Sequence, residues 1–174
     1  MKTSFELCEP LDPETCFRDH RARVYRWAFA MCRRHADALD VTQEVFLSLV
    51  RKPPALSSRR AAIGWLRRAT ANRVVDRWRG ESARTARELA HVPREESEPP
   101  LETRELYEHV RAALLGLSEQ QRIVLMAKCY DQLTFQQIAD EIGIAVPTAK
   151  THYLRALAAV RERLRPLVEA GRIQ

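Results

Sequence analysis

Residues 148–155 contain side chains of the types that read double-stranded DNA. Hydroxyl, imidazole, ammonium and guanidinium groups can bond base edges and phosphates in a major groove, where each base pair presents a distinct pattern. Helical spacing turns these polar groups outward and an apolar series inward. The inward series is Ala149, Tyr153, Ala156, Leu157 and Val160. The candidate duplex-reading set is Thr148, Lys150, Thr151, His152 and Arg155.

Residues 134–155 supply the elements that would present this face. Thr134 and Gln137 have the spacing of a capping box, which satisfies two backbone N–H groups at a helix start. Gly143 suits the positive φ that ends such a helix, and Pro147 suits the first turn of the next. The pattern predicts a helix-turn-helix. The alternative is an ordinary helical hairpin with a solvated outer face.

A second candidate nucleic-acid face lies on residues 61–79, next to a basic loop over residues 51–60. Arginines can hold phosphates, aromatic rings can accept an unstacked base, and an amide or carboxylate can read its Watson–Crick edge. Trp65 and Trp78 supply the aromatic rings, although the alternative is that they belong to the core. The polar side chains on this helix are Asn72, Arg73, Asp76, Arg77 and Arg79.

The positive charge is concentrated in the first half of the chain. The net charge is +6, and residues 14–80 hold 15 Lys and Arg against 6 Asp and Glu. Such a concentration favours a polyanionic partner, because binding releases counterions from the polyanion. A basic, solvated surface without a partner is the alternative explanation.

The chain of 174 residues, with 45% hydrophobic residues and 5 Gly, is predicted to be all-α. Two small helical domains are expected, over residues 1–80 and 105–174, joined by a flexible linker over 81–104 in which 83–90 can prolong a helix. Helices are predicted over 12–35, 37–50 and 61–79, with four more after the linker. In the first two helices the residues expected to face inward are Phe17, Val24, Trp27, Ala28 and Met31, then Leu39, Val45, Phe46 and Leu49.

No run of about 18 apolar residues occurs, and the N-terminus lacks the apolar core of a signal peptide, so a cytoplasmic protein without membrane insertion is expected. Cys8, Cys16, Cys32 and Cys129 form no CxxC pair. Cys16 with His20, or Cys32 with His35, can share a helix face, but buried structural thiols are commoner than metal sites. No metal site, cofactor or catalytic residue is predicted.

Taken together, these segments resemble the extracytoplasmic-function sigma factors, small two-domain members of the sigma-70 family of bacterial transcription initiation factors. DALDVTQEVFLSL and WLRRATANRVVDRWRG resemble region 2 of that family. LSEQQRIVLMAKCYDQLTFQQIADEIGIAVPTAKTHYLRAL resembles region 4. The resemblance covers about residues 14–80 and 105–164, in the family's order and spacing.

The resemblance implies an alternative sigma factor whose partners are core RNA polymerase, promoter DNA and an anti-sigma factor. The residues implied to bind polymerase are Asp40, Gln43, Glu44 and Phe46. Those implied to engage the minus-10 non-template strand are Ser57, Ser58, Arg59, Arg60, Asn72, Arg73, Asp76 and Arg77. Thr148, Lys150, Thr151, His152 and Arg155 are implied to face the minus-35 duplex.

Three positions depart from the family pattern. Gln137 stands where Glu is usual, Ala145 where a capping Ser is common, and Ala149 where Val is usual. Loss of a cap costs about 1 kcal/mol locally, so the second helix of the motif is expected to be less firmly held at its start.

Three other functions compete with promoter recognition by a sigma factor. A polymerase-independent repressor or activator could use the helix-turn-helix as a dimer on palindromic duplex sites, but it leaves the first-half charge and aromatic residues unexplained. A sigma mimic that titrates a regulatory protein usually carries a receiver domain, for which the chain has no room. An enzyme is disfavoured, because no phosphate-binding glycine loop or nucleophile elbow occurs.

Overall fold

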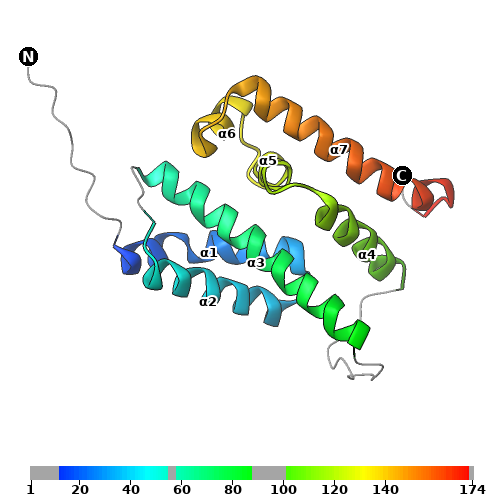
Figure 1. Ribbon diagram of the computed structural model, residues 1–174, viewed down its shortest axis with the longest axis horizontal. Helices are drawn as coiled ribbons and strands as arrows, with labels where there is room; N and C mark the ends of the chain where they lie inside the picture. The colour runs from blue at the N-terminus through cyan, green and yellow to red at the C-terminus, as the bar shows by residue number, and fades with distance from the viewer. Residues whose placement is uncertain (1–11, 55–57, 88–100, 173–174) are drawn as a thin grey trace, which may run out of the picture. The chain divides into compact units, whose positions relative to one another are not determined.

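The computed structural model describes residues 12–54, 58–87 and 101–172 (Figure 1). These residues form seven helices and no strand, which confirms the all-α prediction. Nowhere in these three ranges is a helix both long enough and apolar enough to cross a bilayer. The helices are α1 Pro13–Cys32, α2 His35–Arg51, α3 Arg59–Arg87, α4 Leu101–Gly116, α5 Glu119–Cys129, α6 Phe135–Ile142 and α7 Val146–Glu169.

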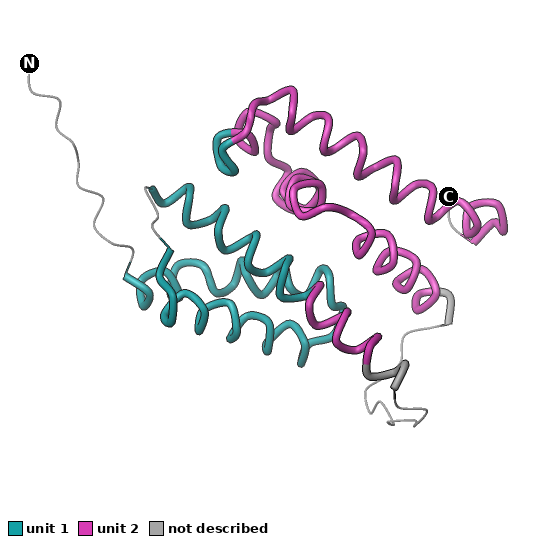
Figure 2. Tube along the Cα trace, viewed as in Figure 1, with its two compact units in different colours: residues 1–74, 140–143 teal, residues 75–139, 144–174 magenta. Residues whose placement is uncertain are grey.

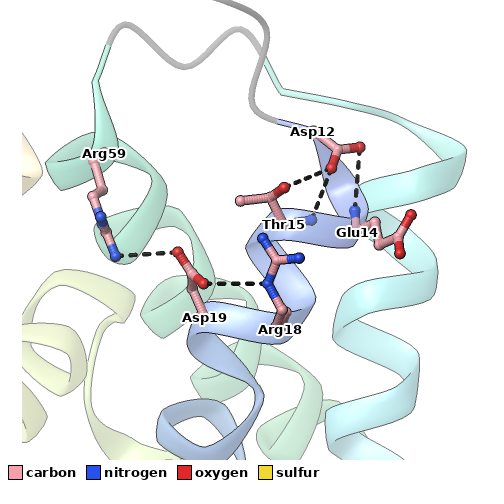
Figure 3. A network of polar contacts seen from close by, with 6 residues as sticks. All are labelled: Asp12, Glu14, Thr15, Arg18, Asp19 and Arg59. Carbon is pink, nitrogen blue, oxygen red and sulfur yellow. Dashed lines mark hydrogen bonds and ion pairs between the residues drawn. The ribbon is translucent and has the colours of Figure 1, made fainter.

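The start of α1 is fixed by Asp12, whose carboxylate caps the helix (Figure 3). Asp12 Oδ2 accepts hydrogen bonds from the Thr15 backbone N–H at 2.9 Å and from Thr15 Oγ1 at 2.8 Å. These bonds lower the pKa of the Asp12 carboxyl. Pro13 follows in the first turn, where its missing N–H leaves no bond unmade. At the other end Arg33 adopts a left-handed conformation with φ 56°, which lets α2 begin two residues later.

α3 extends beyond the expected helix over residues 61–79 and into the segment 83–90, which the sequence allows to prolong it. The expected helix over residues 61–79 begins at Arg59 and continues to Arg87, and α4 begins at Leu101. Residues 81–87 contain no proline or glycine, and Ser82 Oγ donates to the Trp78 carbonyl at 3.0 Å. Both ends of the predicted linker 81–104 are therefore helical. Its central residues, 88–100, lie outside the described part of the chain.

The chain divides into two compact units (Figure 2). The first contains residues 1–74 and 140–143, and the second contains residues 75–139 and 144–174. The division falls within α3, so this long helix contributes its first half to one unit and its second half to the other.

The core of the first unit is formed by one stripe of each helix. The buried residues include Val24, Trp27, Ala28 and Met31 of α1, Val41, Val45, Phe46 and Leu49 of α2, and Leu66, Ala71 and Val74 of α3. Two residues expected to face inward do not: Phe17 is 43% exposed and Leu39 is 42% exposed. The buried stripe of α2 begins at Ala38, so the next residue, Leu39, is turned about 100° away from it. Phe17 instead lies edge-on against Phe46, with ring centroids 4.9 Å apart.

The second unit is built around α5, where every residue from Ile123 to Ala127 is buried. α7 contacts both α4 and α5, and its buried residues are Ala149, Ala156 and Leu167. Where the buried residue is alanine, a helix can approach its neighbours closely. Leu157, expected to face inward, is exposed, and Tyr153 and Val160 are half-buried. Of the series predicted to face inward, only Ala149 and Ala156 are therefore fully buried.

His20 is a buried titratable group on α1, one turn after the buried Cys16. Burial lowers the pKa of His20 below its usual 6.5, and the nearby charges of Arg59 and Arg23 lower it further, while Asp19 opposes them. The neutral imidazole is thus the form that suits the core of the first unit.

The pH dependence of stability tests this assignment. The folded chain binds a proton at His20 less readily than the unfolded chain, so the free energy of unfolding should fall as the pH drops below about 6.5. Urea unfolding followed by tryptophan fluorescence at pH 7.5 and pH 5.5 measures the difference. His20→Gln should shrink that difference, whereas His109→Gln should preserve it. Equal pH dependence in both variants would contradict the assignment.

Candidate nucleic-acid interface

The first half of the helix-turn-helix has the capping box that the sequence predicts. The Thr134 backbone N–H donates to Gln137 Oε1 at 2.8 Å, and the Gln137 backbone N–H donates to Thr134 Oγ1 at 3.2 Å. Gly143 has φ 72°, and Pro147 lies in the first turn of α7. The tight turn between α6 and α7 is confirmed.

Side chains of the second unit lock this motif onto α5. The Phe135 and Tyr153 rings meet edge-to-face, with centroids 5.5 Å apart. Lys128 Nζ lies 5.2 Å from the centroid of the Phe135 ring and donates to the Leu133 carbonyl at 3.0 Å. A cation over an aromatic ring is worth about 0.5–1 kcal/mol at a partly exposed site. These contacts hold the first turns of α7 in place, together with the buried Ala149.

The outer face of α7 is largely as predicted. Thr148, Lys150, Thr151 and Arg155 are exposed. The Thr151 hydroxyl donates to the Pro147 carbonyl at 2.9 Å, so its oxygen is left to accept a bond from outside. His152 differs, because it is half-buried and its Nδ1 atom is buried without a hydrogen-bond partner in the described chain. One of its two ring nitrogens is therefore turned away from the outer face.

The start of α7 lacks a side-chain cap, as the sequence indicated. Ala145 has the extended backbone of a capping residue, φ −71° and ψ 147°, and its carbonyl accepts from the Ala149 N–H at 3.0 Å. A methyl group cannot bond the free N–H groups of the first turn. The start of the candidate recognition helix is therefore held by packing and by Pro147.

The predicted minus-10 residues are distributed over the first turn and the middle of α3. Arg59 and Arg60 are exposed at its start, Asp76 is exposed, and Asn72, Arg73 and Arg77 are half-buried. Ser58 Oγ accepts from the Ala61 N–H at 3.1 Å, so this hydroxyl caps α3. Ser57 lies outside the described residues.

The tryptophans of the first half have different surroundings. Trp27 and Trp78 are buried, which makes them core residues, and Trp65 is half-buried. Arg67 of α3 is only 1% exposed and places its guanidinium 4.9 Å from the centroid of the Trp27 ring. Sequence reasoning missed this buried arginine, although its spacing to the buried Thr70 and Val74 marks it as part of the inner stripe.

Arg59 and Arg73, both predicted to contact DNA, form ion pairs with the two preceding helices. Arg59 Nη2 lies 3.2 Å from Asp19 Oδ2 on α1 (Figure 3). Arg73 Nε lies 3.2 Å from Glu44 Oε2 on α2. The two ion pairs join the charged side of α3 to the two preceding helices.

The predicted polymerase-binding set lies on α2, but its members are not equally accessible. Asp40 and Gln43 are exposed and Glu44 is half-buried. Phe46 is 6% exposed, so it belongs to the core and does not offer its ring to a partner. Leu47 is exposed and lies seven residues after Asp40, on the same face of the helix. Sequence reasoning missed Leu47, although an apolar residue outside the buried stripe of a helix is a signal for a contact surface.

The cysteines do not assemble a metal site in the described residues. No group of three His, Cys, Asp or Glu side chains is placed to hold an ion there. The thiols of Cys16 and Cys32 are buried and that of Cys129 is exposed, and Cys8 lies outside the described residues. Desolvation raises the pKa of the Cys16 and Cys129 thiols, which keeps them protonated at neutral pH.

A helix-turn-helix with a polar outer face, on a chain that also has an arginine-rich helix, defines a helical DNA-binding protein. Comparison with known protein families identifies the class of DNA-binding protein more closely. The Sigma-70 region 2 model matches residues 16–84, and the Sigma-70, region 4 model matches residues 107–160. The chain belongs to the sigma-70 family, and within it to the extracytoplasmic-function sigma factors; it is an alternative sigma factor.

Individual relatives agree with this assignment. The chain is 28% identical to the RNA polymerase sigma-E factor of Streptomyces coelicolor over 161 residues, covering 90% of this chain and 88% of that protein. It is 29% identical to the ECF RNA polymerase sigma factor SigL of Mycobacterium tuberculosis, covering 87% and 88%. It is 28% identical to the sigma factor SigV of Bacillus subtilis, covering 86% and 89%. None of these matches supports the alternative of a polymerase-independent repressor or activator.

A solved structure has a similar fold. The sigma factor RpoE of Bartonella quintana, determined in complex with the anti-sigma factor NepR, matches with a TM-score of 0.51 and 17% identity. The match covers 87% of this chain and 96% of that one. At this identity the likeness concerns the fold alone.

The missing cap of α7 gives a direct test of how that helix is held. Ala145→Ser supplies a hydroxyl at a position with capping geometry and should stabilise the second unit by about 1 kcal/mol. Thermal unfolding followed by circular dichroism measures the gain. Ala158→Ser adds the same hydroxyl to an exposed position inside α7 and should give no gain. Equal changes in both variants would show that capping does not limit this helix.

Proposed function

We propose that the chain binds core RNA polymerase and directs it to promoters by reading a minus-35 duplex with α7 and capturing the minus-10 non-template strand with α3. The observation that carries this proposal is the order of two DNA-suited faces on one chain, each lying within a matched sigma region. The chain would perform no covalent chemistry and would act in the cytoplasm, where its polymerase and promoters are.

The minus-35 reader is the exposed outer face of α7. Lys150 and Arg155 supply the charges for phosphates and guanine edges, and Thr148 supplies a hydroxyl. Pro147 and the buried Ala149 fix the first turn, so these side chains are presented from a rigid helix. The second nitrogen of His152 remains a candidate for the same surface.

The minus-10 reader is the charged side of α3. Arg59 and Arg60 are exposed at its start, and Asn72, Arg73, Asp76 and Arg77 follow along the helix. Arginine side chains hold the backbone of a single strand, and Trp65, which is half-buried, is the aromatic candidate for stacking with an unpaired base. Trp78 is excluded from that role because it is buried.

The polymerase-binding face is the exposed side of α2, formed by Asp40, Gln43, Glu44 and Leu47. Acidic groups around an exposed leucine suit a complementary basic partner with an apolar centre. An anti-sigma factor is a further expected partner, because the structurally similar sigma factor was determined in complex with one.

Reconstituted transcription tests the function. The purified chain with core polymerase should give a specific run-off transcript, and Arg155→Ala should lower its amount about 5- to 100-fold, since a base or phosphate contact is worth about 1–3 kcal/mol. Arg161→Ala, an exposed arginine further along α7, should leave the transcript unchanged. The proposal would be refuted if no candidate promoter gave a core-dependent transcript, including the DNA directly upstream of the gene that encodes this chain.

Leu47 tests the polymerase-binding face. Leu47→Asp places a charge at the centre of this face and should weaken binding of the labelled chain to core polymerase at least tenfold without changing the circular dichroism spectrum. Val168→Asp makes the same kind of change at an exposed valine of α7 and serves as the control. If both variants bind core polymerase as well as the unaltered chain does, α2 does not form the interface.

A further inference from the structure

One ion pair joins the proposed polymerase-binding face to the proposed DNA-binding face. Glu44 of α2 lies among the polymerase-binding residues, and Arg73 of α3 lies among the minus-10 residues. Glu44 Oε2 and Arg73 Nε are 3.2 Å apart, and both residues belong to the first unit. The ion pair therefore links two surfaces that lie on separate segments of the sequence.

The ion pair is suited to exchange. The Arg73 and Glu44 side chains are 42% and 45% exposed, so water reaches both partners. An exposed ion pair of this kind contributes little to stability, and either partner can leave it for a stronger one. A carboxylate and a phosphate present similar oxygen pairs to a guanidinium, so Glu44 occupies the position on Arg73 that a DNA phosphate would take.

We propose that Glu44 is a positioning residue that holds Arg73 in the free chain and releases it when polymerase covers α2. A basic polymerase surface that engages the Glu44 carboxylate removes the partner of Arg73, which then becomes available to a phosphate of the non-template strand. Core binding and strand capture are coupled through this exchange. The inference rests on the proposed function, because it assigns α2 to polymerase and α3 to DNA.

Binding of the isolated full-length chain to a fluorescently labelled dT20 strand tests the hold on Arg73. Anisotropy titrations at several KCl concentrations give the affinity and its salt dependence. Glu44→Gln should tighten binding about two- to fivefold and steepen the logarithmic salt slope by about 0.7, the value for one added phosphate contact on a single strand. Glu14→Gln removes the same charge from α1, where this carboxylate makes no ion pair within the described chain, and should change the salt slope little.

Arg73→Gln should affect dT20 binding differently in the isolated chain and in its complex with core polymerase. In the isolated chain this substitution should leave dT20 binding nearly unchanged, because Glu44 already occupies Arg73. In the complex with core polymerase it should weaken binding of the same strand and reduce the salt slope by about 0.7. The double variant Glu44→Gln/Arg73→Gln should lose the gain of Glu44→Gln in the isolated chain.

Two results would overturn the inference. One is a Glu44→Gln chain whose affinity and salt slope match those of Glu14→Gln. The other is an Arg73→Gln chain that weakens dT20 binding equally with and without polymerase. If either occurs while the chain still supports core-dependent run-off transcription, the coupling fails and the proposed function stands. If no core-dependent transcript forms, the proposed function fails first.

Discussion

The rest of the structure depends on α3, which must be a core helix on one side and a charged surface on the other. Its inner stripe buries Leu66 and Val74, and it even buries the guanidinium of Arg67 over the Trp27 ring. Its outer side presents the arginines that the sigma-70 resemblance assigns to the minus-10 strand. Because both sets lie on one helix, packing against α1 and α2 determines the direction in which the outer side chains of α3 point.

α7 also has a buried side and a polar outer side, but it is held in place by different contacts. Its fully buried residues, Ala149 and Ala156, are small and allow close approach to neighbouring helices, while Leu167 is buried nearer its other end. Its first turn has Pro147 but no capping side chain, so Phe135 and Tyr153 take a larger share in holding it.

The ion pairs of the first unit reduce the positive charge that is left unpaired on its surface. The basic excess of residues 14–80 suggests a surface open to a polyanion, yet Arg59 is paired with Asp19 and Arg73 with Glu44. Part of the positive charge is therefore already matched by carboxylates from α1 and α2. Composition counts such arginines as unpaired positive charge, whereas in the structure each already has a carboxylate partner.

The sequence by itself determined the all-helical class, the capping box of Thr134 and Gln137, the glycine turn at Gly143 and most of the outer face of α7, because these depend on spacing within about four residues. It also indicated the family. Only the tertiary structure decided that Leu39 and Phe17 are exposed and that Arg67 is buried. It alone brought Glu44 to Arg73. Helical periodicity is local, whereas burial and ion pairing between helices depend on how separate segments pack, which no short sequence pattern encodes.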